Sequence, residues 1–317
     1  MPARATPPDP IDSLLALDLG GRGIGGFFQP GGALAAARAL HGASRVLLVT
    51  GFAVGQHLPE SDGPPGTAVL GRALRRLGAD VRYVTDATTA PVLAAVLKVL
   101  DEPAEILPAP ADDDSAAALL EAERPSHLVA VERPGRGASG DYLNARGASV
   151  AAWNRPLDGL FIAARRGRGA RPVTVGVGDG GNEIGMGNVR ARLARSGALL
   201  ARIASVVRVD HLVVAGVSNW GAYGIVAQLG RLAGLDLLHA PAVERRLVEA
   251  CAESGAVDGI TRRREATVDG LPLDAHAAMV RLLGVAAAAA GPAGPAPAPV
   301  TRRRAPRPPP PRRRRAR

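Results

Sequence analysis

Cysteine, aromatic residues and long apolar runs are scarce in this chain of 317 residues. The single cysteine, Cys251, excludes an internal disulfide framework and fits a reducing compartment, and its apolar helical surroundings indicate a packed thiol. No run of about 18 apolar residues predicts a membrane helix, and the first residues lack the apolar segment of a signal peptide. We therefore expect a cytoplasmic protein without membrane contact.

Several common catalytic motifs are also absent. The six histidines are scattered without the H-x-x-x-H spacing of zinc hydrolases, and there is no G-x-S-x-G nucleophile elbow. After the glycines of the segment "GVGDGGNEIGMGN", Met186 takes the place that a phosphate-binding loop gives to lysine. The sequence thus lacks the commonest hydrolase and nucleotide-binding signatures.

Positive charge is concentrated at one end of the chain. The net charge is +10, but nine of the 39 basic residues are arginines within the last 27 residues. The other 30 basic residues face 29 acidic ones, so the main body is nearly neutral. The Pro-, Ala- and Arg-rich segment 291–317 is predicted to be a disordered tail that makes at most weak contacts with nucleic acid. Nucleic-acid binding as the main role would be steeply salt-dependent and would need this tail.

Apolar strands alternate with helical patterns along residues 11–290, after a short disordered N-terminus at residues 1–10. This rhythm predicts one α/β domain with a largely parallel sheet flanked by helices. Near the C-terminus, an Asp269–Gly270 turn predicts a small hairpin, which a final helix follows. The expected strands are Ser44–Thr50, Asp80–Thr85, His127–Glu132, Pro172–Val177 and His211–Gly216, and the expected helices are Gly66–Leu77, Pro91–Leu100, Ser115–Glu123, Leu157–Arg166, Glu183–Arg195, Ala222–Ala233 and Asp274–Leu283.

Four of the predicted strands end in unusual loops rich in glycine and acidic residues. In parallel sheets the carboxyl ends of the strands converge on one rim, where ligands bind. The loops after the first, third, fourth and fifth strands contain "PESDGPPG", "ERPGRGASGDYLNARG", "GDGGNEIGMGN" and "AGVSNWGAYG". We therefore predict a single site on this rim.

The glycine-rich loop carries two carboxylates, Asp179 and Glu183, which a phosphate would not favour. One hypothesis is a divalent cation, Mn or Mg, bound by these two acids with Asp62 and Glu132. A second is a zwitterion, with the carboxylates on its ammonium group and the loop amides and a helix N-terminus near Glu183 on its carboxylate. A third is that Asp179 and Asn182 only cap the helix and Glu183 complements its dipole.

The other loops add candidate contacts to a ligand. Arg133 is a candidate carboxylate clamp, against the simpler interpretation of a surface ion pair. Asn219 can orient a ligand, and the indole of Trp220 can exclude water, although a tryptophan in such an aromatic-poor chain can equally be a core anchor.

The chain resembles the D-glutamate cyclase family over nearly all of its length except the two ends. The matching region corresponds to the C-terminal part of the animal mitochondrial enzyme, whose separate N-terminal domain has no counterpart here. The family pattern has threonine where this chain has Ser61. The shared motifs, in unchanged order, are "GGRGI", "TGF", "ESDGPPG", "AVERPGRGASGDYLNARG", "GVGDGGNEIGMGNV", "AGVSNWGAYG" and "VDGLPLDAHAAMV".

The resemblance implies a lyase that closes D-glutamate to 5-oxo-D-proline with loss of water. This reaction needs a base for the ammonium group and an acid or cation at the departing oxygen, but no organic cofactor. We expect Glu183 to be the preferred base, with Asp179 beside it. Asp62 and Glu132 are then either the acid or, with Asp179 and Glu183, ligands of Mn or Mg.

The resemblance also implies how an amino-acid substrate is held. Arg133 and the amides of the glycine loop would bind carboxylate, Asn219 would orient the γ-carboxyl group, and Trp220 would shield it. The loop amides belong to Gly180, Gly181 and Asn182. A divalent-metal-dependent hydrolase of a small anionic metabolite, built from the same loops, is the alternative.

Overall fold

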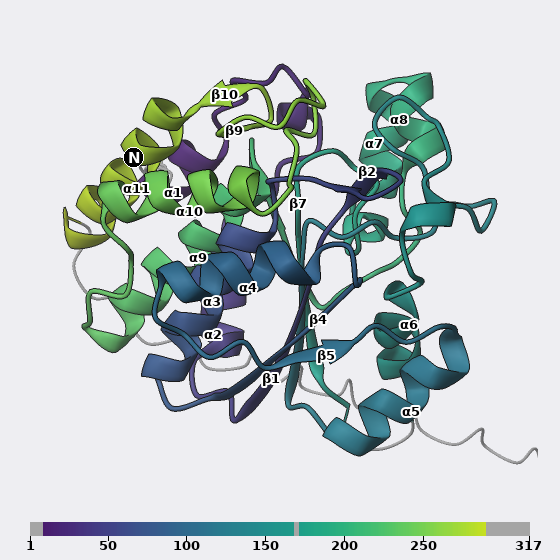
Figure 1. The fold of residues 1–317 in the computed structure, drawn as a ribbon, viewed down its shortest axis with the longest axis horizontal. Coiled ribbons are helices and arrows are strands. Elements are labelled where there is room, and N and C mark those ends of the chain that lie inside the picture. The colour runs from purple at the N-terminus through teal and green to yellow at the C-terminus, as the bar shows by residue number, and fades with distance from the viewer. Residues whose placement is uncertain (1–8, 168–170, 290–317) are drawn as a thin grey trace, which may run out of the picture.

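The computed structural model describes residues 9–167 and 171–289. Its centre is a parallel sheet of six strands between two layers of helices (Figure 1). This confirms the α/β architecture that the sequence predicts. The strands of this sheet are β1 (Arg45–Thr50), β4 (Asp80–Thr85), β5 (Ile106–Pro108), β6 (His127–Val131), β7 (Val173–Gly178) and β8 (His211–Val214).

The strand order is β5-β4-β1-β6-β7-β8, so the chain builds the sheet outward in two directions from β1. β1 pairs with β4 on one side and with β6 on the other, and Leu48 lies opposite both Tyr83 and Val129. The direction of growth reverses between β1 and β6. In open α/β sheets such a switch point leaves a crevice at the carboxyl ends of the strands, where ligands bind.

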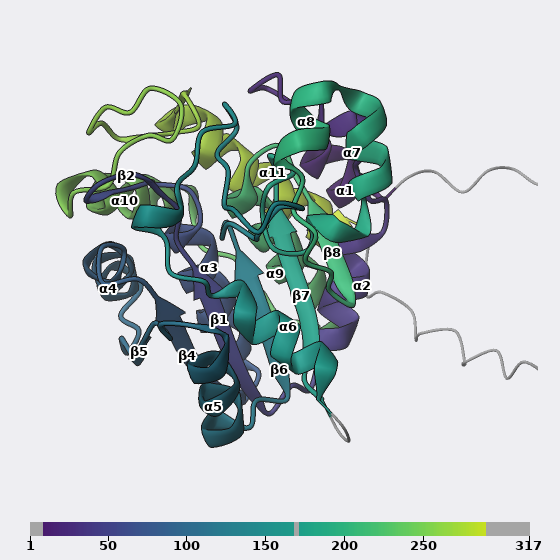
Figure 2. The same cartoon turned by 90° about the vertical axis from the view of Figure 1, so that its right-hand side faces the viewer.

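Alternating side chains of each strand enter two separate hydrophobic cores. On β1, Val46 and Leu48 pack in one core, and Leu47 and Val49 pack in the other. Both faces are apolar because both are covered, as is typical of parallel sheets. Figures 1 and 2 show the two layers. Among the described residues, the larger layer of helices covers the first face. They are α1 (Pro10–Leu15), α2 (Gly32–Leu40), α3 (Pro64–Arg76), α4 (Ala90–Val99), α9 (Ser218–Ala233), α10 (Pro241–Glu253) and α11 (Leu273–Ala289).

The second face is covered by a smaller layer of helices and short 3-10 turns. Its members are η1 (Ile24–Gly26), α5 (Asp113–Glu123), α6 (Asp158–Arg166), η3 (Met186–Asn188), α7 (Arg190–Ser196) and α8 (Ala198–Ile203). One further 3-10 turn, η2, spans Ala151–Trp153.

Two small hairpins lie above the carboxyl ends of the strands (Figure 1). One joins β2 (Ala53–Gly55) to β3 (Leu58–Pro59), and the other joins β9 (Thr267–Val268) to β10 (Leu271–Pro272). The second is the hairpin predicted from the Asp-Gly turn, and α11 follows it as expected. Both hairpins therefore sit where the loops of the site converge.

The predicted strands all form, with ends shifted by no more than two residues, but one predicted helix does not. The prediction of a helix that begins at Glu183 is wrong, because the chain there forms a loop and the short turn η3 before α7 begins. Gly181 and Gly185 adopt φ values of 96° and 104° in this loop, which a helix cannot contain.

The predicted termini fall largely outside the described residues. The tail at 291–317 lies wholly beyond them, as do residues 1–8 of the expected N-terminal segment. Within the described part of the chain, none of the helices combines the length and the hydrophobicity that crossing a bilayer requires.

Candidate active site

Asp62 and Asn219 hold the two helices that begin at the switch point. The Asp62 carboxylate accepts the amides of Ser218 and Asn219, both at 2.9 Å, at the start of α9. The Asn219 side-chain oxygen accepts the amides of Gly63 and Gly66, at 3.0 and 2.7 Å, at the start of α3. Helix N-termini carry unpaired N–H groups, and each residue thus caps the other's helix.

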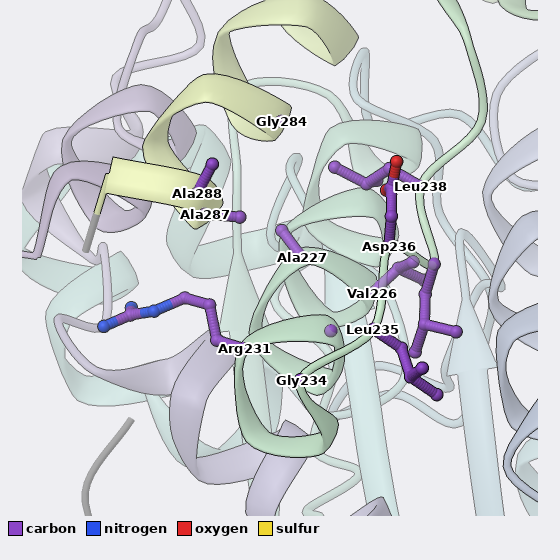
Figure 3. Close-up of a pocket in the computed structure, with 12 residues that line it drawn as sticks. Val226, Ala227, Arg231, Gly234, Leu235, Asp236, Leu238, Gly284, Ala287 and Ala288 are labelled. Carbon is purple, nitrogen blue, oxygen red and sulfur yellow. The ribbon is translucent and has the colours of Figure 1, made fainter. Parts of the chain in front are cut away.

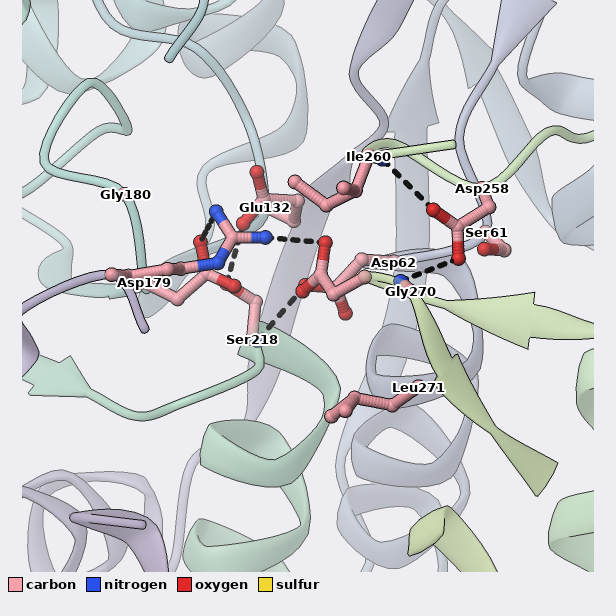
Figure 4. Close-up of polar contacts among 12 residues, drawn as sticks. Ser61, Asp62, Glu132, Asp179, Gly180, Ser218, Asp258, Ile260, Gly270 and Leu271 are labelled. Atoms are coloured by element: carbon pink, nitrogen blue, oxygen red, sulfur yellow. Dashed lines mark hydrogen bonds and ion pairs between the residues drawn. The ribbon is translucent and has the colours of Figure 1, made fainter. Parts of the chain in front are cut away.

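Three carboxyl groups meet where β1, β6 and β7 end. Asp62, Glu132 and Asp179 are buried, and one oxygen of each lies within 4.8 Å of one from each of the others (Figure 4). Glu132 follows β6 directly with a left-handed φ of 44°, and its carboxylate accepts a hydrogen bond of 2.5 Å from the Ser218 hydroxyl. The structure therefore brings together three of the four acids that the sequence singled out, and Ser218 joins them.

Arg22 supplies positive charge to this cluster. Its guanidinium lies 3.0 Å from Asp179 and also pairs with Asp269, which the β9–β10 turn brings in. The backbone around Arg22 is held by Asp18, whose carboxylate accepts the amides of Arg22 and Gly23, both at 2.7 Å. Neither Arg22 nor Asp269 was among the predicted site residues, although both lie in motifs shared with the family, "GGRGI" and "VDGLPL".

Burial and mutual repulsion raise the pKa values of the clustered carboxyl groups. Burial is the main cause for Glu132, whose pKa is raised well above its usual range, and the charge of Glu183 adds to it. Burial also raises the pKa of Asp179 well above normal, against the opposing effect of Arg22. For Asp62, burial and the charge of Asp269 raise the pKa to about 8. One guanidinium does not neutralise so many acids, so the site retains protons or attracts a cation.

Glu183 folds back onto its own loop. Its two carboxylate oxygens accept the amides of Gly180 and Gly181, at 2.7 and 2.8 Å. These are two of the amides that we expected to bind a substrate carboxylate, so in this structure an internal carboxylate occupies them. Asn182 instead donates from its side chain to the carbonyl of Leu143, at 2.7 Å.

Arg133 and Trp220 lie away from the cluster's open side. The guanidinium of Arg133 is fully buried, pairs with Asp86 and donates to the carbonyl of Gly51 at 2.8 Å. Trp220 is also fully buried, and its indole N–H donates to Nδ1 of His276 at 3.0 Å. The geometry therefore favours structural roles for these two side chains over the expected contacts with substrate.

A cavity of about 60 Å³ opens above the acidic cluster. A single water needs roughly 10–15 Å³, so the cavity suits a small molecule and not a polymer. Of the predicted site residues, Glu132, Asn182 and Glu183 line it, whereas Asp62 and Asp179 do not. Its walls also include Arg22, Phe52, Val54, Glu60, Asn144, Ala145, Arg146, Gly259, Ile260, Arg262 and Asp269.

Glu60 and Asp269 are acids of this wall that were not among the predicted site residues. Glu60 lies in the "PESDGPPG" loop, where it forms an acidic doublet with Asp62. Burial raises the pKa of Glu60 well above its usual range, and the charges of Asp269 and Asp62 raise it further. The loop was recognisable from its composition, but which of its two acids faces the cavity was not.

A larger groove of about 540 Å³ lies between α9 and the end of α11 (Figure 3). Arg231 and Asp236 are the charged residues that line it, and the other lining residues are apolar or glycine. None of the clustered acids contributes to its walls. This groove is larger than the cavity above the acids, but the chemistry that can move a proton lies in the smaller cavity.

The cluster also has the donor set of a divalent-cation site. Hard cations such as Mn and Mg bind carboxylate oxygens. Asp62, Glu132 and Asp179 each offer one, and the Asp179 carboxylate pairs with Arg22 but accepts no hydrogen bond from a described residue. These three residues therefore fit such a cation, which would take over part of the charge balance that Arg22 provides.

Comparisons with known proteins agree with the motifs. Residues 11–284 match the model of a family described as "D-glutamate cyclase-like, C-terminal". The human protein "D-glutamate cyclase, mitochondrial" is 36% identical over 241 residues, which make up 69% of this chain. The match covers 38% of the human protein, so the chain spans well under half of that relative's length.

Two solved structures show only distant likeness. An exopolyphosphatase-related protein from Bacteroides fragilis has a TM-score of 0.40 at 8% identity, over 80% of this chain and 55% of its own. RecJ from Thermus thermophilus, in complex with Mn²⁺, has a TM-score of 0.35 at 14% identity, over 88% of this chain and 38% of its own. Scores this low carry no argument about function.

Proposed function

The chain belongs to the D-glutamate cyclase-like C-terminal family, and we propose that it cyclises D-glutamate to 5-oxo-D-proline with loss of water. The observation that carries this proposal is the small cavity whose wall joins Glu132 and Glu183 to Arg22. A substrate with one ammonium and two carboxylate groups complements a wall that contains both charges. The D configuration is proposed from the family relationship.

Glu132 and Glu183, two of the three glutamates that line the cavity, can divide the acid and base work. We assign Glu183 as the base that takes a proton from the ammonium group, which frees the nitrogen lone pair to attack the γ-carboxyl carbon. Glu132, whose pKa burial raises well above its usual range, is the acid that we assign to donate a proton to the departing oxygen. A C–N bond forms and a C–O bond breaks.

The protons balance over the whole reaction. Two protons leave the ammonium nitrogen, and two reach the oxygen that departs as water. Glu183 then passes its proton to the departing oxygen and Glu132 takes the second proton from the nitrogen, so each carboxyl group ends in the protonation state in which it began. Holding the chain of the substrate curled inside a small cavity supplies the proximity that an intramolecular attack requires.

The remaining acids support this pair. Asp179 anchors Arg22, and Asp62 fixes the start of α9, from which the Ser218 hydroxyl donates to Glu132. Alternatively, Asp62, Glu132 and Asp179 would hold a divalent cation, which would polarise the γ-carboxyl group in place of the proton that Glu132 donates. Asn219 orients the backbone of the site through its cap, in place of the direct contact with substrate that we expected.

The direct test is incubation of the protein with D-glutamate and, separately, L-glutamate, each with Mn, with Mg and with chelator. Chiral chromatography would follow 5-oxoproline. We expect product from the D isomer. Absence of 5-oxoproline under every condition would overturn the proposal.

Variants then test the two roles. Glu183→Gln and Glu132→Gln should each lower kcat by at least about 100-fold, the usual range for loss of a general acid or base. Glu253→Gln on α10, an exposed glutamate outside the cavity, is the matched control and should keep full activity. Circular dichroism and thermal melting would establish that the inactive variants remain folded.

A metal-dependent hydrolase of a small anionic metabolite is a second candidate. The close approach of Asp62, Glu132 and Asp179 favours it, because metal hydrolases use such carboxylate sets. Chelator-sensitive release of product from phosphate or carboxylate esters, without 5-oxoproline formation, would support it. The expected cytoplasmic location also stays a proposal, since the human relative is named as mitochondrial.

A further inference from the structure

The cavity has a sharp division of charge between its inner wall and its mouth. Glu60, Glu132 and Asp269 are buried acids of the inner wall, whereas Arg146 and Arg262 are exposed cations that line the same cavity. No carboxylate among the described residues lies within ion-pairing distance of either arginine. Arg146 and Arg262, which have no ion-pair partner among the described residues, therefore lie beside a cavity whose inner wall is acidic.

The mouth is a built feature, since several hydrogen bonds fix its loops. The Asp258 carboxylate accepts hydrogen bonds from the amides of Ile260 and Gly270, at 2.9 and 2.7 Å. These bonds tie the loop that carries Arg262 to the β9–β10 turn (Figure 4). Arg146 donates to the carbonyl of Ile260 at 3.2 Å from the opposite side. The two arginines therefore belong to loops that are tied together beside the cavity.

The backbone of Arg262 adds a second indication. Its φ of 59° lies in the left-handed region, which glycine or asparagine would occupy at lower cost. Its amide donates to the carbonyl of Asp258 at 2.8 Å, so the turn imposes this conformation. An unfavourable backbone that presents a cation to a cavity points to a function for that cation.

We propose that Arg146 and Arg262 bind the α-carboxylate of the substrate and so select amino acids that carry one. This rests on the proposed cyclisation. The ammonium nitrogen and the γ-carboxyl group must both reach the acids of the inner wall in order to react. The α-carboxylate takes no part in the bond changes, so it points outward. Arginine is the side chain best suited to hold it, through two parallel hydrogen bonds.

A pair of ligands that differ by one carboxylate tests this assignment by direct binding. 5-Oxo-D-proline carries the α-carboxylate, and 2-pyrrolidinone is the same ring without it. Calorimetry would give both affinities for the wild type, Arg146→Gln, Arg262→Gln and the double variant. Arg263→Gln is the matched control, because Arg263 is exposed, pairs with Glu265 and does not line the cavity.

Each single variant should bind 5-oxo-D-proline up to about fivefold more weakly, as is usual for an exposed charge pair, and the double variant should lose more. Binding of 2-pyrrolidinone should not change. In turnover, KM for D-glutamate should rise with little change in kcat, whereas KM for 4-aminobutanoate, which lacks the α-carboxylate, should stay the same.

Three results would overturn the assignment: wild-type protein that does not bind 5-oxo-D-proline, equal affinity in the double variant, or an equal loss in Arg263→Gln. Failure of the proposed reaction gives a different pattern. In that case the wild type forms no 5-oxoproline, while binding of the carboxylate still depends on the two mouth arginines.

Discussion

Asp62 and Asn219 cap each other's helices across the switch point of the sheet. Asp62 precedes α3 but accepts amides at the start of α9, and Asn219 belongs to α9 but accepts amides at the start of α3. Both side chains are buried. These reciprocal caps hold the start of α3, which follows Asp62, beside the start of α9. The Ser218 hydroxyl at that end of α9 donates to Glu132.

These reciprocal caps predict that truncation of the Asn219 side chain destabilises the folded protein. Asn219→Ala leaves the amide of Gly66 buried without its acceptor, whereas the amide of Gly63 keeps the Asp62 carboxylate at 3.0 Å. The free energy of unfolding should fall by about 1–3 kcal/mol. Urea denaturation would measure the change, with Gln56→Ala at an exposed position as the control. An unchanged midpoint for Asn219→Ala would show that the cap contributes nothing.

The buried thiol of Cys251 gives a second prediction. Burial raises the pKa of this thiol far above its usual range, and the nearby Glu244 raises it further. Because the thiolate is the reactive form, a thiol reagent should label essentially no Cys251 in the native protein between about pH 6 and 9. One thiol per chain should react in denaturant. Rapid native labelling that accelerates with pH would contradict this account.

The sequence predicted the parts of this molecule that depend on local pattern. β1, β6, β7 and β8 are largely apolar runs and β4 alternates polar with apolar residues before its apolar end, so their positions could be read directly. The acids that follow them had to meet, because parallel strands end on one rim. β5 was missed because it is a three-residue strand at the sheet edge with no buried residue.

The features of the site that could not be predicted from the sequence depend on tertiary packing. Arg22 and Asp269 lie about 250 positions apart in the chain and meet only because the N-terminal loop and the β9–β10 turn lie over the same strands. The Glu183 side chain folds back onto its own loop, in which Gly181 and Gly185 adopt positive φ values. No periodic pattern in the sequence reveals such a backbone conformation. The sequence suggested that Arg133 either binds a carboxylate or forms a surface ion pair. Its buried partner, Asp86, could not be recognised because it is distant in sequence.

The raised carboxyl pKa values predict how stability varies with pH in the absence of a divalent cation. The pKa values of Glu132 and Asp179 in the folded protein are raised above their values in the unfolded chain, mainly by burial. The folded state then binds more protons, so the free energy of unfolding should fall as the pH rises through the folded pKa values. The Asp62 value of about 8 places part of this fall near neutral pH.

Urea denaturation in chelator at about pH 6 and pH 9 would measure this effect. The protein should be less stable at the higher pH, by up to about 1.4 kcal/mol per pH unit for each group that titrates. Glu132→Gln removes one of these groups and should flatten the dependence. A protein that grows more stable as the pH rises over this range would show that the clustered acids are ionised throughout.

Arg22 and a divalent cation should compensate for one another, since both neutralise the same carboxylates. Arg22→Gln leaves Asp179 and Asp269 buried without a charged partner, which should cost about 3–5 kcal/mol of stability in chelator. Mn should then raise the melting temperature of Arg22→Gln more than that of the wild type, while Arg22→Lys, which keeps the charge, should lie between them. Equal shifts in all three proteins would mean that the cation binds elsewhere, because only a cation at these carboxylates can replace the missing guanidinium.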